Sequence, residues 1–242
     1  MSVPDFLIVG AQKAGTSSLY AYLRQHPGLF LSARKEPHFF CSPGDGRPPP
    51  WTGDADAQVM QVMTFDPDRY AALFADAGGR PCGEASTMYL VDPDVPARVV
   101  AANPDVRVVV LLRDPVERAY AAWWMWRRDR LEPLEFATAL EAETARTASG
   151  WGPNFAYRGG GLYAEHLQRW RHVLGPDRML VLRTEALRTD RLATVQSVFT
   201  FLGVDAGFAP DVRREHNRGS GPRPHGPPRG RHPLRSARVR AR

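Results

Sequence analysis

The sequence predicts an α/β domain in which a central, mainly parallel sheet is flanked by helices in three layers. Residues 6–9 and 107–112 are short apolar runs of the kind that form buried strands. The second run is rich in valine and almost unbroken, as in parallel strands that are covered on both faces. Each run leads through a tight polar turn into a segment whose apolar residues recur at helical spacing. This alternation of strands and helices predicts a doubly wound sheet.

Local signals set the limits of the other elements. Proline at a first helical position and glycine after a last turn are typical helix boundaries, and Pro115, Gly175 and Gly203 stand at such places. In the first part of the chain we expect a helix from about residue 16, a strand at 29–31, a helical stretch at 59–74 whose second part begins at Asp66, and a strand from residue 82. Helices are then expected at 96–102, from residue 115 and at 131–144, followed by a glycine-rich loop at 150–161 that is a candidate lid. The last expected elements are a helix at 163–174, a strand at 179–183 and a closing helix at 192–202.

The charge of the chain is unevenly distributed. A chain of 242 residues can bury one sizeable core, and we expect one domain over residues 1–209. Residues 210–242 contain ten arginines and two acidic residues, Asp211 and Glu215, so the net charge of this tail is +8. Since the whole chain has a net charge of +6, residues 1–209 carry −2. The tail is rich in arginine, proline and glycine and too poor in apolar residues to fold, so we expect it to be disordered. Nucleic acid is therefore not an expected partner, except through this tail, where a polyanionic glycan is the other candidate.

Several classes of protein are not expected. The sequence contains no run of 18 or more apolar residues and no signal-peptide pattern, so we expect a cytoplasmic protein without a membrane span. Cys41 and Cys82 are too few and too irregularly spaced for a disulfide framework or a zinc site. We find no cluster of metal-ligand residues in the sequence and expect a function that needs no metal.

The turn that follows the first strand has the features of a phosphate-binding loop. Gly10 and Gly15 bound it, and its amides, together with the first N–H groups of the next helix, can converge on an anion. The spacing is that of the nucleoside-triphosphate loop G-x-x-x-x-G-K-[ST], but Thr16 stands where the lysine belongs, and the lysine is Lys13 inside the loop. Such a lysine is expected to lie near the bond that breaks on a shorter phosphate group. A glycine turn that only connects strand and helix is the alternative interpretation.

The loop sequence Gln-Lys-Ala-Gly-Thr-Ser-Ser resembles the 5′-phosphosulfate loop of sulfotransferases that use 3′-phosphoadenosine 5′-phosphosulfate (PAPS). The resemblance implies a P-loop-like α/β fold and adenosine 3′,5′-bisphosphate as the nucleotide product. It implies that Lys13 stabilises the negative charge on the leaving phosphate. It also implies that PAPS is bound by Gln12, Lys13, Ala14, Gly15, Thr16, Ser17 and Ser18.

A second resemblance follows the strand at 107–112. The segment Arg-Asp-Pro-Val-Glu-Arg-Ala-Tyr-Ala resembles the family pattern Arg-[Asp or Asn]-Pro-x-x-Arg-Ala-x-Ser, whose first arginine and last serine hold the 3′-phosphate of PAPS. Arg113 would thus bind the phosphate at the carboxyl end of a strand, where open α/β sheets bind ligands. Ala121 replaces the serine and cannot donate a hydrogen bond, while Arg118 is expected to brace the helix. Tyr163 lies in a Gly-x-Tyr segment that, in the family, closes over the nucleotide.

The segment Arg-Lys-Glu-Pro-His-Phe-Phe resembles a third family motif, from the heparan-sulfate-like and bacterial branches. In that motif the glutamate of Glu-x-His-Phe-Phe is the catalytic base, which implies that Glu36 takes the proton of the acceptor. We expect the apolar neighbours Phe39 and Phe40 to raise the pKa of Glu36. His38 is the rival base, because its ordinary pKa is closer to neutrality. A surface ion pair of Glu36 with Lys35 or Arg34 is the alternative interpretation, without catalysis.

The segment Gly-Glu-Ala-Ser-Thr-Met-Tyr, which begins at Gly83, resembles the family's Gly-Glu-[Lys or Ala]-[Ser or Thr]-x-x-Tyr along the acceptor side. Ala85 stands where many relatives have lysine, and Glu84 is either a functional carboxylate or a carboxylate that only ends a strand. Together the motifs predict a sulfotransferase that moves a sulfuryl group from PAPS to a hydroxyl or amine of a small-molecule acceptor, namely a carbohydrate or other natural product.

Two other functions are compatible with the loop. A small-molecule kinase would share the loop and the helix, but the sequence lacks both a lysine after Gly15 and an evident magnesium-binding acid after an apolar strand. A catalytically degenerate protein that binds a nucleotide or a polyanion is suggested by Ala121 and Ala85.

Overall fold

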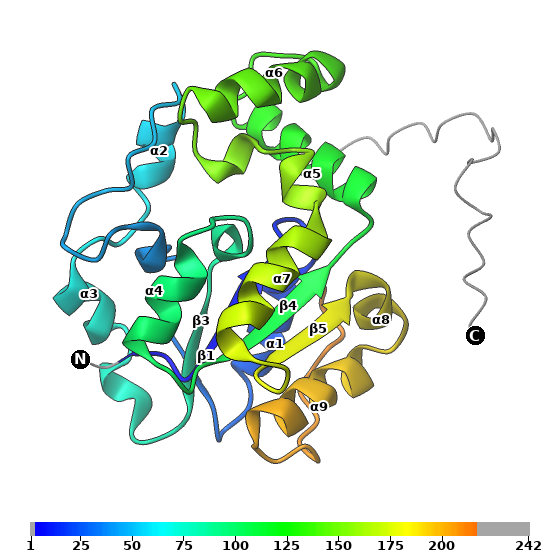
Figure 1. Cartoon of the computed structure of the whole chain (residues 1–242). Coiled ribbons are helices and arrows are strands. Elements are labelled where there is room, and N and C mark those ends of the chain that lie inside the picture. Colours follow the sequence, from blue (N-terminus) through cyan, green and yellow to red (C-terminus); the bar gives the residue numbers. More distant parts are fainter. Residues whose placement is uncertain (1–2, 217–242) are drawn as a thin grey trace, which may run out of the picture.

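The computed structural model describes residues 3–216 and shows a five-stranded sheet in the order β2-β3-β1-β4-β5 (Figure 1). The central strand β1 (Phe6–Gly10) pairs with β3 (Cys82–Ala85) on one side and with β4 (Arg107–Leu112) on the other. The edges are β2 (Phe30–Leu31) and β5 (Met179–Arg183). Every pairing is parallel, so the predicted α/β class is confirmed and the sheet is parallel throughout.

Helices and short turns connect these strands. The α-helices are α1 (Thr16–Leu23), α2 (Asp56–Met60), α3 (Pro67–Ala72), α4 (Val95–Ala102), α5 (Pro115–Arg128), α6 (Phe136–Ala148), α7 (Tyr163–Leu174), α8 (Thr184–Thr189) and α9 (Arg191–Leu202). The 3₁₀ turns are η1 (Phe39–Cys41), η2 (Ala75–Ala77), η3 (Thr87–Leu90), η4 (Pro153–Phe155) and η5 (Gly159–Gly161).

The direction of the crossovers places helices on both faces of the sheet. The chain passes from β1 through α1 and β2 to β3, and then returns past β1 through α4 to β4. Because such crossovers are right-handed, α1 and α4 lie on opposite faces. On these two faces α1 packs with α9, and α4 packs with α7, which gives the three predicted layers (Figure 1).

The centre of the core is formed by β1 and β4, whose side chains are covered on both faces. Residues 6–9 and 108–111 are at most 1% exposed, as the apolar runs predict. Gly10 ends β1 with a φ of 146°, and a Cβ there would lie 2.9 Å from the Cβ of Leu90. Glycine is therefore required where the chain leaves β1 against η3 and enters the phosphate-binding loop.

The helical stretch predicted at 59–74 is two short helices in the structure. α2 ends at Met60, and α3 begins only at Pro67. The carboxylate of Asp66 accepts hydrogen bonds from the backbone N–H groups of Asp68 and Arg69, at 2.9 Å each, and so caps α3. The predicted start of the second part is confirmed, whereas continuity between the two parts is wrong.

A second, smaller core lies beyond the carboxyl ends of the strands, between α5 and α6 (Figure 1). Next to it, the guanidinium of Arg146 and the carboxylate of Glu132 form a buried ion pair with N–O distances of 2.6 and 2.9 Å. The hydroxyl of Tyr157 also donates to Glu132, at 2.8 Å. The buried members of this core are Ala55, Ala119, Ala122, Trp123, Ala139, Phe155 and Tyr157.

The helix α6 begins at Phe136, five residues after the predicted start. Pro133 has no N–H to give to a helix, and the N–H groups of Leu131 and Glu132 donate instead to the carbonyl of Trp126 at the end of α5. These bonds turn the chain between the two helices before α6 can start.

The last described residues run along α1. The N–H of Asp211 donates to the side-chain oxygen of Gln25 at 2.8 Å, and the Tyr22 hydroxyl donates to the carbonyl of Arg214 at 2.8 Å. The segment that the sequence assigns to the tail therefore includes residues that are bonded to the domain. The rest of the segment predicted to be disordered, residues 217–242, lies outside the described part of the chain.

Candidate active site

The structure brings the two phosphate motifs together. β1 and β4 are neighbours in the sheet, so the segments that follow them leave the same edge. The Arg113 guanidinium donates to the carbonyl oxygen of Lys13 at 3.2 Å. The hydroxyl of Thr184, just after β5, donates to the carbonyl oxygens of Ala14 and Leu112, at 2.6 and 2.9 Å. Lys13 and Arg113 therefore lie close enough to contact one ligand.

The loop between β1 and α1 is shaped to receive an anion. Lys13 and Gly15 have left-handed backbone conformations, with φ of 69° and 99°, which turn the loop tightly into the helix. Thr16 and Ser17 do not cap α1 with their side chains, although the sequence allows it, and the first turn contains no acidic residue. The positive end of the helix dipole is therefore not neutralised by α1 itself, and this geometry fits a phosphate or phosphosulfate group.

The ammonium of Lys13 lies under α5. Its Nζ is 3.7 Å from the sulfur of Met125. Burial, followed by the charge of Arg128, lowers the pKa of Lys13, while the carboxylate of Glu36 acts in the opposite direction. Lys13 therefore lies within electrostatic reach of both Glu36 and Arg113. An ammonium in this position gains most from an anion placed beside it, because the anion would compensate for the lost solvation.

Gln12 points to a segment that the sequence does not connect with the loop. Its side-chain nitrogen donates to the side-chain oxygen of Asn154 at 3.1 Å, and the indole N–H of Trp126 donates to the carbonyl of Asn154 at 3.1 Å. Asn154 is 5% exposed and joins the phosphate-binding loop to α5. It lies 142 residues from Gln12, and nothing in the local sequence distinguishes it from other loop residues.

Two predicted cofactor ligands have partners within the chain. The Ser18 hydroxyl accepts from the N–H of His216 at 2.9 Å and donates to the carbonyl of the same residue at 3.2 Å. Ala14 is fully buried, and its carbonyl accepts from Thr184. Ser18 thus holds the C-terminal segment at the start of α1, and a direct bond from its hydroxyl to a nucleotide would require this contact to change.

Arg113 has an acidic partner that the motif does not predict. Its guanidinium donates from Nε and Nη2 to one oxygen of Glu117, at 3.1 and 2.8 Å. Its backbone carbonyl accepts from the hydroxyl of Tyr163 at 2.9 Å, so the predicted nucleotide-closing tyrosine also braces this turn. Ala121 lies further along α5, partly exposed, on the helix that Arg113 precedes.

The predicted base lies in a turn with two left-handed residues. Glu36 has a φ of 61° and His38 a φ of 52°. The carboxylate of Glu36 forms an ion pair with Lys35, lies 3.2 Å from Nε2 of His38 and accepts from the hydroxyl of Thr87 at 3.3 Å. The Glu36 side chain is 35% exposed, so an acceptor can approach it. Glu36 and His38 are therefore a contacting pair, and the two rival bases lie at one place.

The expectation that phenylalanines raise the pKa of Glu36 is wrong. Burial alone would raise this pKa, but the hydrogen bond to His38 and the charge of Lys35 outweigh it and lower the pKa below its ordinary value. The two rings point elsewhere, because Phe39 stacks on Tyr70 with ring centroids 4.2 Å apart and Phe40 meets the edge of the same ring. Glu36 is therefore ionised at neutral pH.

The glycine-rich segment at 150–161, which the sequence predicts as a candidate lid, is hydrogen-bonded to α5 and α6. Arg118 is 3% exposed and donates to the carbonyl of Tyr157, and a Cβ on Gly160 would lie 3.1 Å from its guanidinium. Glu143 of α6 accepts from the N–H groups of Arg158 and Gly159, at 2.6 and 2.7 Å. Arg118 thus braces the glycine-rich segment.

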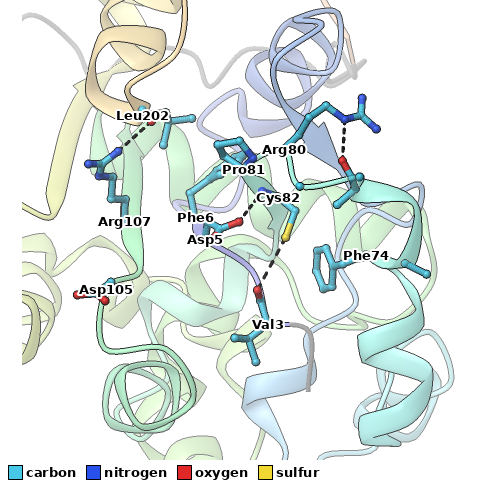
Figure 2. Close-up of a pocket in the computed structure, with 14 residues that line it drawn as sticks. Val3, Asp5, Phe6, Phe74, Arg80, Pro81, Cys82, Asp105, Arg107 and Leu202 are labelled. Carbon is cyan, nitrogen blue, oxygen red and sulfur yellow. Dashed lines mark hydrogen bonds between the residues drawn. The ribbon is translucent and has the colours of Figure 1, made fainter.

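A pocket of about 740 Å³ lies away from these motifs (Figure 2). Phe6, Cys82 and Arg107, the first residues of β1, β3 and β4, line it, so it opens at the amino ends of the strands. Figure 2 shows Arg107 bonded to the carbonyl of Leu202 and Cys82 bonded to Asp5. None of the motif residues lines this pocket.

Residues 3–216 contain no group of three or more histidine, cysteine, aspartate or glutamate side chains that could hold a metal ion. In the same part of the chain, each helix is too short or too polar to cross a bilayer.

A parallel sheet whose first strand leads into a glycine-bounded loop, with an arginine after the neighbouring strand beside that loop, is typical of α/β proteins that bind phosphate groups. Comparison with known proteins narrows this class. The profile described as "Sulfotransferase family" matches residues 4–209. The chain therefore belongs to the sulfotransferase family, a family of enzymes, as the motifs predict.

Individual relatives agree with this assignment. A solved sulfotransferase from Alicyclobacillus acidocaldarius is 38% identical, with a TM-score of 0.81 over 89% of this chain and 87% of that one. Human heparan sulfate glucosamine 3-O-sulfotransferase 3B1 is 28% identical over 84% of this chain and 46% of its own length. Human bifunctional heparan sulfate N-deacetylase/N-sulfotransferase 3 is 27% identical over 84% of this chain and 22% of its own length. The chain thus spans less than half of these two curated relatives.

Proposed function

We propose that this protein transfers a sulfuryl group from PAPS to a hydroxyl or amine of a carbohydrate or natural-product acceptor. The observation that carries the proposal is the contact of Arg113 with the carbonyl of Lys13, because it joins the 5′-phosphosulfate motif and the 3′-phosphate motif in one site. Membership of the sulfotransferase family supports the reaction class. The heparan sulfate enzymes among the relatives support a carbohydrate acceptor.

The nucleotide would be held by both motifs. The amides of the loop at residues 12–18 and the first turn of α1 would receive the 5′ end, and Arg113 would bind the 3′-phosphate. Tyr163 would keep Arg113 in place through its bond to the Arg113 carbonyl. PAPS supplies the sulfuryl group and a phosphate that can leave.

Lys13 and Glu36 would share the chemistry. Lys13 places a positive charge in the loop, where it can stabilise negative charge that develops on a phosphate oxygen. Glu36 is ionised and partly exposed, so its carboxylate can accept the proton of an approaching hydroxyl or amine. His38 contacts that carboxylate through Nε2 and would orient it. The lowered pKa makes Glu36 a weak base, so this proposal depends on close positioning more than on basicity.

Calorimetry combined with a transfer assay tests this function. We expect the protein to bind PAPS and adenosine 3′,5′-bisphosphate without magnesium and to transfer sulfate from labelled PAPS. Binding of ATP that depends on magnesium would instead indicate a kinase, and nucleotide binding without transfer to any of a broad set of carbohydrate and natural-product acceptors would indicate a degenerate binding protein.

Three variants assign the roles of Lys13, Glu36 and His38. Lys13→Ala should lower turnover about a hundredfold, in line with the loss of one preorganised charge, and near-normal turnover would remove Lys13 from the mechanism. Glu36→Gln should bind the nucleotide normally but fail to transfer. If His38→Ala has that phenotype and Glu36→Gln does not, His38 is the base.

A further inference from the structure

Behind Glu36 lies a second carboxylate that the proposed mechanism does not use. Glu84, on β3, is fully buried. The hydroxyl of Ser86 donates to its Oε2 at 2.8 Å, and the hydroxyl of Tyr70 lies 3.4 Å from its Oε1. None of the ion pairs found among residues 3–216 includes this carboxylate. A carboxyl group buried without a cation is unfavourable, so its position needs a reason.

Ser86 connects this carboxyl group to the base. A serine hydroxyl has one proton, which here goes to Glu84, and its lone pair accepts from the backbone N–H of His38 at 3.0 Å. The next residue, Thr87, donates to the carboxylate of Glu36 at 3.3 Å. The N–H of Glu36 donates to a carbonyl of the same segment, that of Ala85, at 2.8 Å. The end of β3 thus holds the turn of the base at three points.

The turn needs such support. Glu36 and His38 both have positive φ, which residues other than glycine rarely adopt, so the turn is unfavourable unless its surroundings fix it. The N–H of His38 is in a residue that is 4% exposed, so losing Ser86 as an acceptor would leave it without compensation from bulk solvent. The side chain of His38 in turn contacts Glu36.

We infer that Glu84 is a positioning residue for the proposed reaction: through Ser86 it fixes the backbone of His38 and thereby the contact between His38 and Glu36. This inference rests on the proposed function, because it assigns a purpose to the geometry of the proposed base. Among residues 3–216, the hydrogen bonds of the Glu84 side chain go to Tyr70 and Ser86, not to the loop at 10–15 or to Glu36.

The charge of Glu84 adds a dependence on pH. Burial is the largest influence and raises the pKa of Glu84 to about 7, the hydrogen bond from Ser86 opposes it, and the charge of Glu36 raises it further. Ser86 therefore donates to a neutral carboxyl group below this pH and to a stronger, charged acceptor above it. The titratable groups that face Glu84 come from five elements or turns, and they are Tyr20, Glu36, Cys41, Tyr70 and Tyr89.

Three variants separate the role of the Glu84 charge, the role of the Glu84 oxygen that accepts from Ser86, and the role of the Ser86 hydroxyl that connects Glu84 to His38. Glu84→Gln keeps an oxygen for Ser86 but has no charge, Glu84→Met removes both, and Ser86→Ala removes the link. Glu132→Gln is the matched control, because it also alters a buried carboxyl group but lies next to the second core, paired with Arg146. Each variant is measured by the NMR shift of the His38 amide proton, by the affinity for adenosine 3′,5′-bisphosphate, and by kcat and KM from pH 5.5 to 8.5 with labelled PAPS and a desulfated heparan oligosaccharide.

We expect Ser86→Ala and Glu84→Met to move the His38 amide proton upfield and to lower kcat about tenfold, with nucleotide affinity within twofold of the parent. Glu84→Gln should retain most of the amide shift and lose the inflection of kcat near pH 7. The control should leave the amide shift unchanged. An unmoved His38 amide in both Ser86→Ala and Glu84→Met would overturn the inference, even where kcat falls.

Failure of the proposed function has a different signature. In that case the parent protein itself would bind no nucleotide or transfer no sulfate to any acceptor, whereas failure of the inference leaves the parent active and the His38 amide shift of the variants unchanged. The NMR measurement needs no acceptor, so a poor choice of oligosaccharide does not affect that test.

Discussion

Replacing Glu84 by glutamine tests the electrostatics of the site through stability, without any substrate. Glu84 is fully buried, and burial, against the hydrogen bond from Ser86, raises its pKa from 4.5 to about 7. The folded protein therefore keeps this proton in a range of pH where the unfolded chain has lost it. The free energy of unfolding must then depend on pH through this one group.

The sign and the size follow from the two pKa values. A raised pKa means that the contribution of Glu84 to stability is fully present below pH 4.5 and is lost as the pH rises through 7. At about 1.4 kcal/mol for each pH unit between 4.5 and about 7, the loss amounts to about 3 kcal/mol.

Urea unfolding followed by tryptophan fluorescence, between pH 4.5 and 8, measures the effect. The difference in unfolding free energy between Glu84→Gln and the parent should move in favour of the variant by about 3 kcal/mol over this range. Titrating groups that do not interact with Glu84 are common to both proteins and cancel in the difference. Glu132→Gln is the control, because Arg146 and the other partners of Glu132 overcome its burial and lower its pKa, so its difference should stay flat above pH 5. A flat difference for Glu84→Gln would refute the reasoning.

Three further substitutions have expected outcomes. Ala121→Ser should tighten the binding of adenosine 3′,5′-bisphosphate about tenfold, the worth of one hydroxyl to a phosphate, and an unchanged affinity in calorimetry would mean that the 3′-phosphate lies elsewhere. Glu117→Gln should free Arg113 from a half-exposed ion pair and so raise the affinity for adenosine 3′,5′-bisphosphate by up to about fivefold, with a larger effect at low salt. Weaker binding in calorimetry would instead show that Glu117 orients the guanidinium of Arg113. Glu132→Gln should lower stability by about 3 kcal/mol, since it leaves Arg146 buried without its partner, and a loss below about 1 kcal/mol in urea unfolding would contradict this.

The strands and the phosphate motifs could be predicted because their signals are local. The apolar run at 107–112 is β4, and the loop between Gly10 and Gly15 enters a helix at Thr16, as predicted. In both places the sequence within ten residues determines the backbone. The helix predicted from residue 131 begins later, because its start depends on bonds to the end of the preceding helix.

The environment of Glu36, the proposed base, could not be predicted in the same way. The pKa of Glu36 depends on where its neighbours point, and Phe39 and Phe40 turn to Tyr70 instead of to the carboxylate. Thr87, which bonds Glu36, lies 51 residues away in the sequence. A motif that names adjacent residues gives their identity but not the direction of their side chains.

Contacts between distant loops were equally hidden. The sequence predicts Gln12 and Ser18 as nucleotide ligands but gives no sign of the Asn154 side chain that Gln12 contacts, or of the backbone of His216 that Ser18 holds. Such partners depend on how the loops at one edge of the sheet pack together. Only the assembled fold supplies that information.

The order of the strands explains why three motifs that are dispersed in the sequence form one site. β1 lies between β3 and β4, and the connections that leave β1 and β3 run in opposite directions across the sheet. At such a reversal the loops after neighbouring strands separate, and open α/β sheets bind their ligands in the gap. The loop at Lys13 leaves β1 at this point, with Arg113 after β4 on one side and Thr87, after β3, on the other, where it bonds Glu36. A nucleotide bound between Lys13 and Arg113 would thus present its sulfuryl end toward Glu36. The reversal of strand order at β1 would therefore set the direction of transfer that we propose.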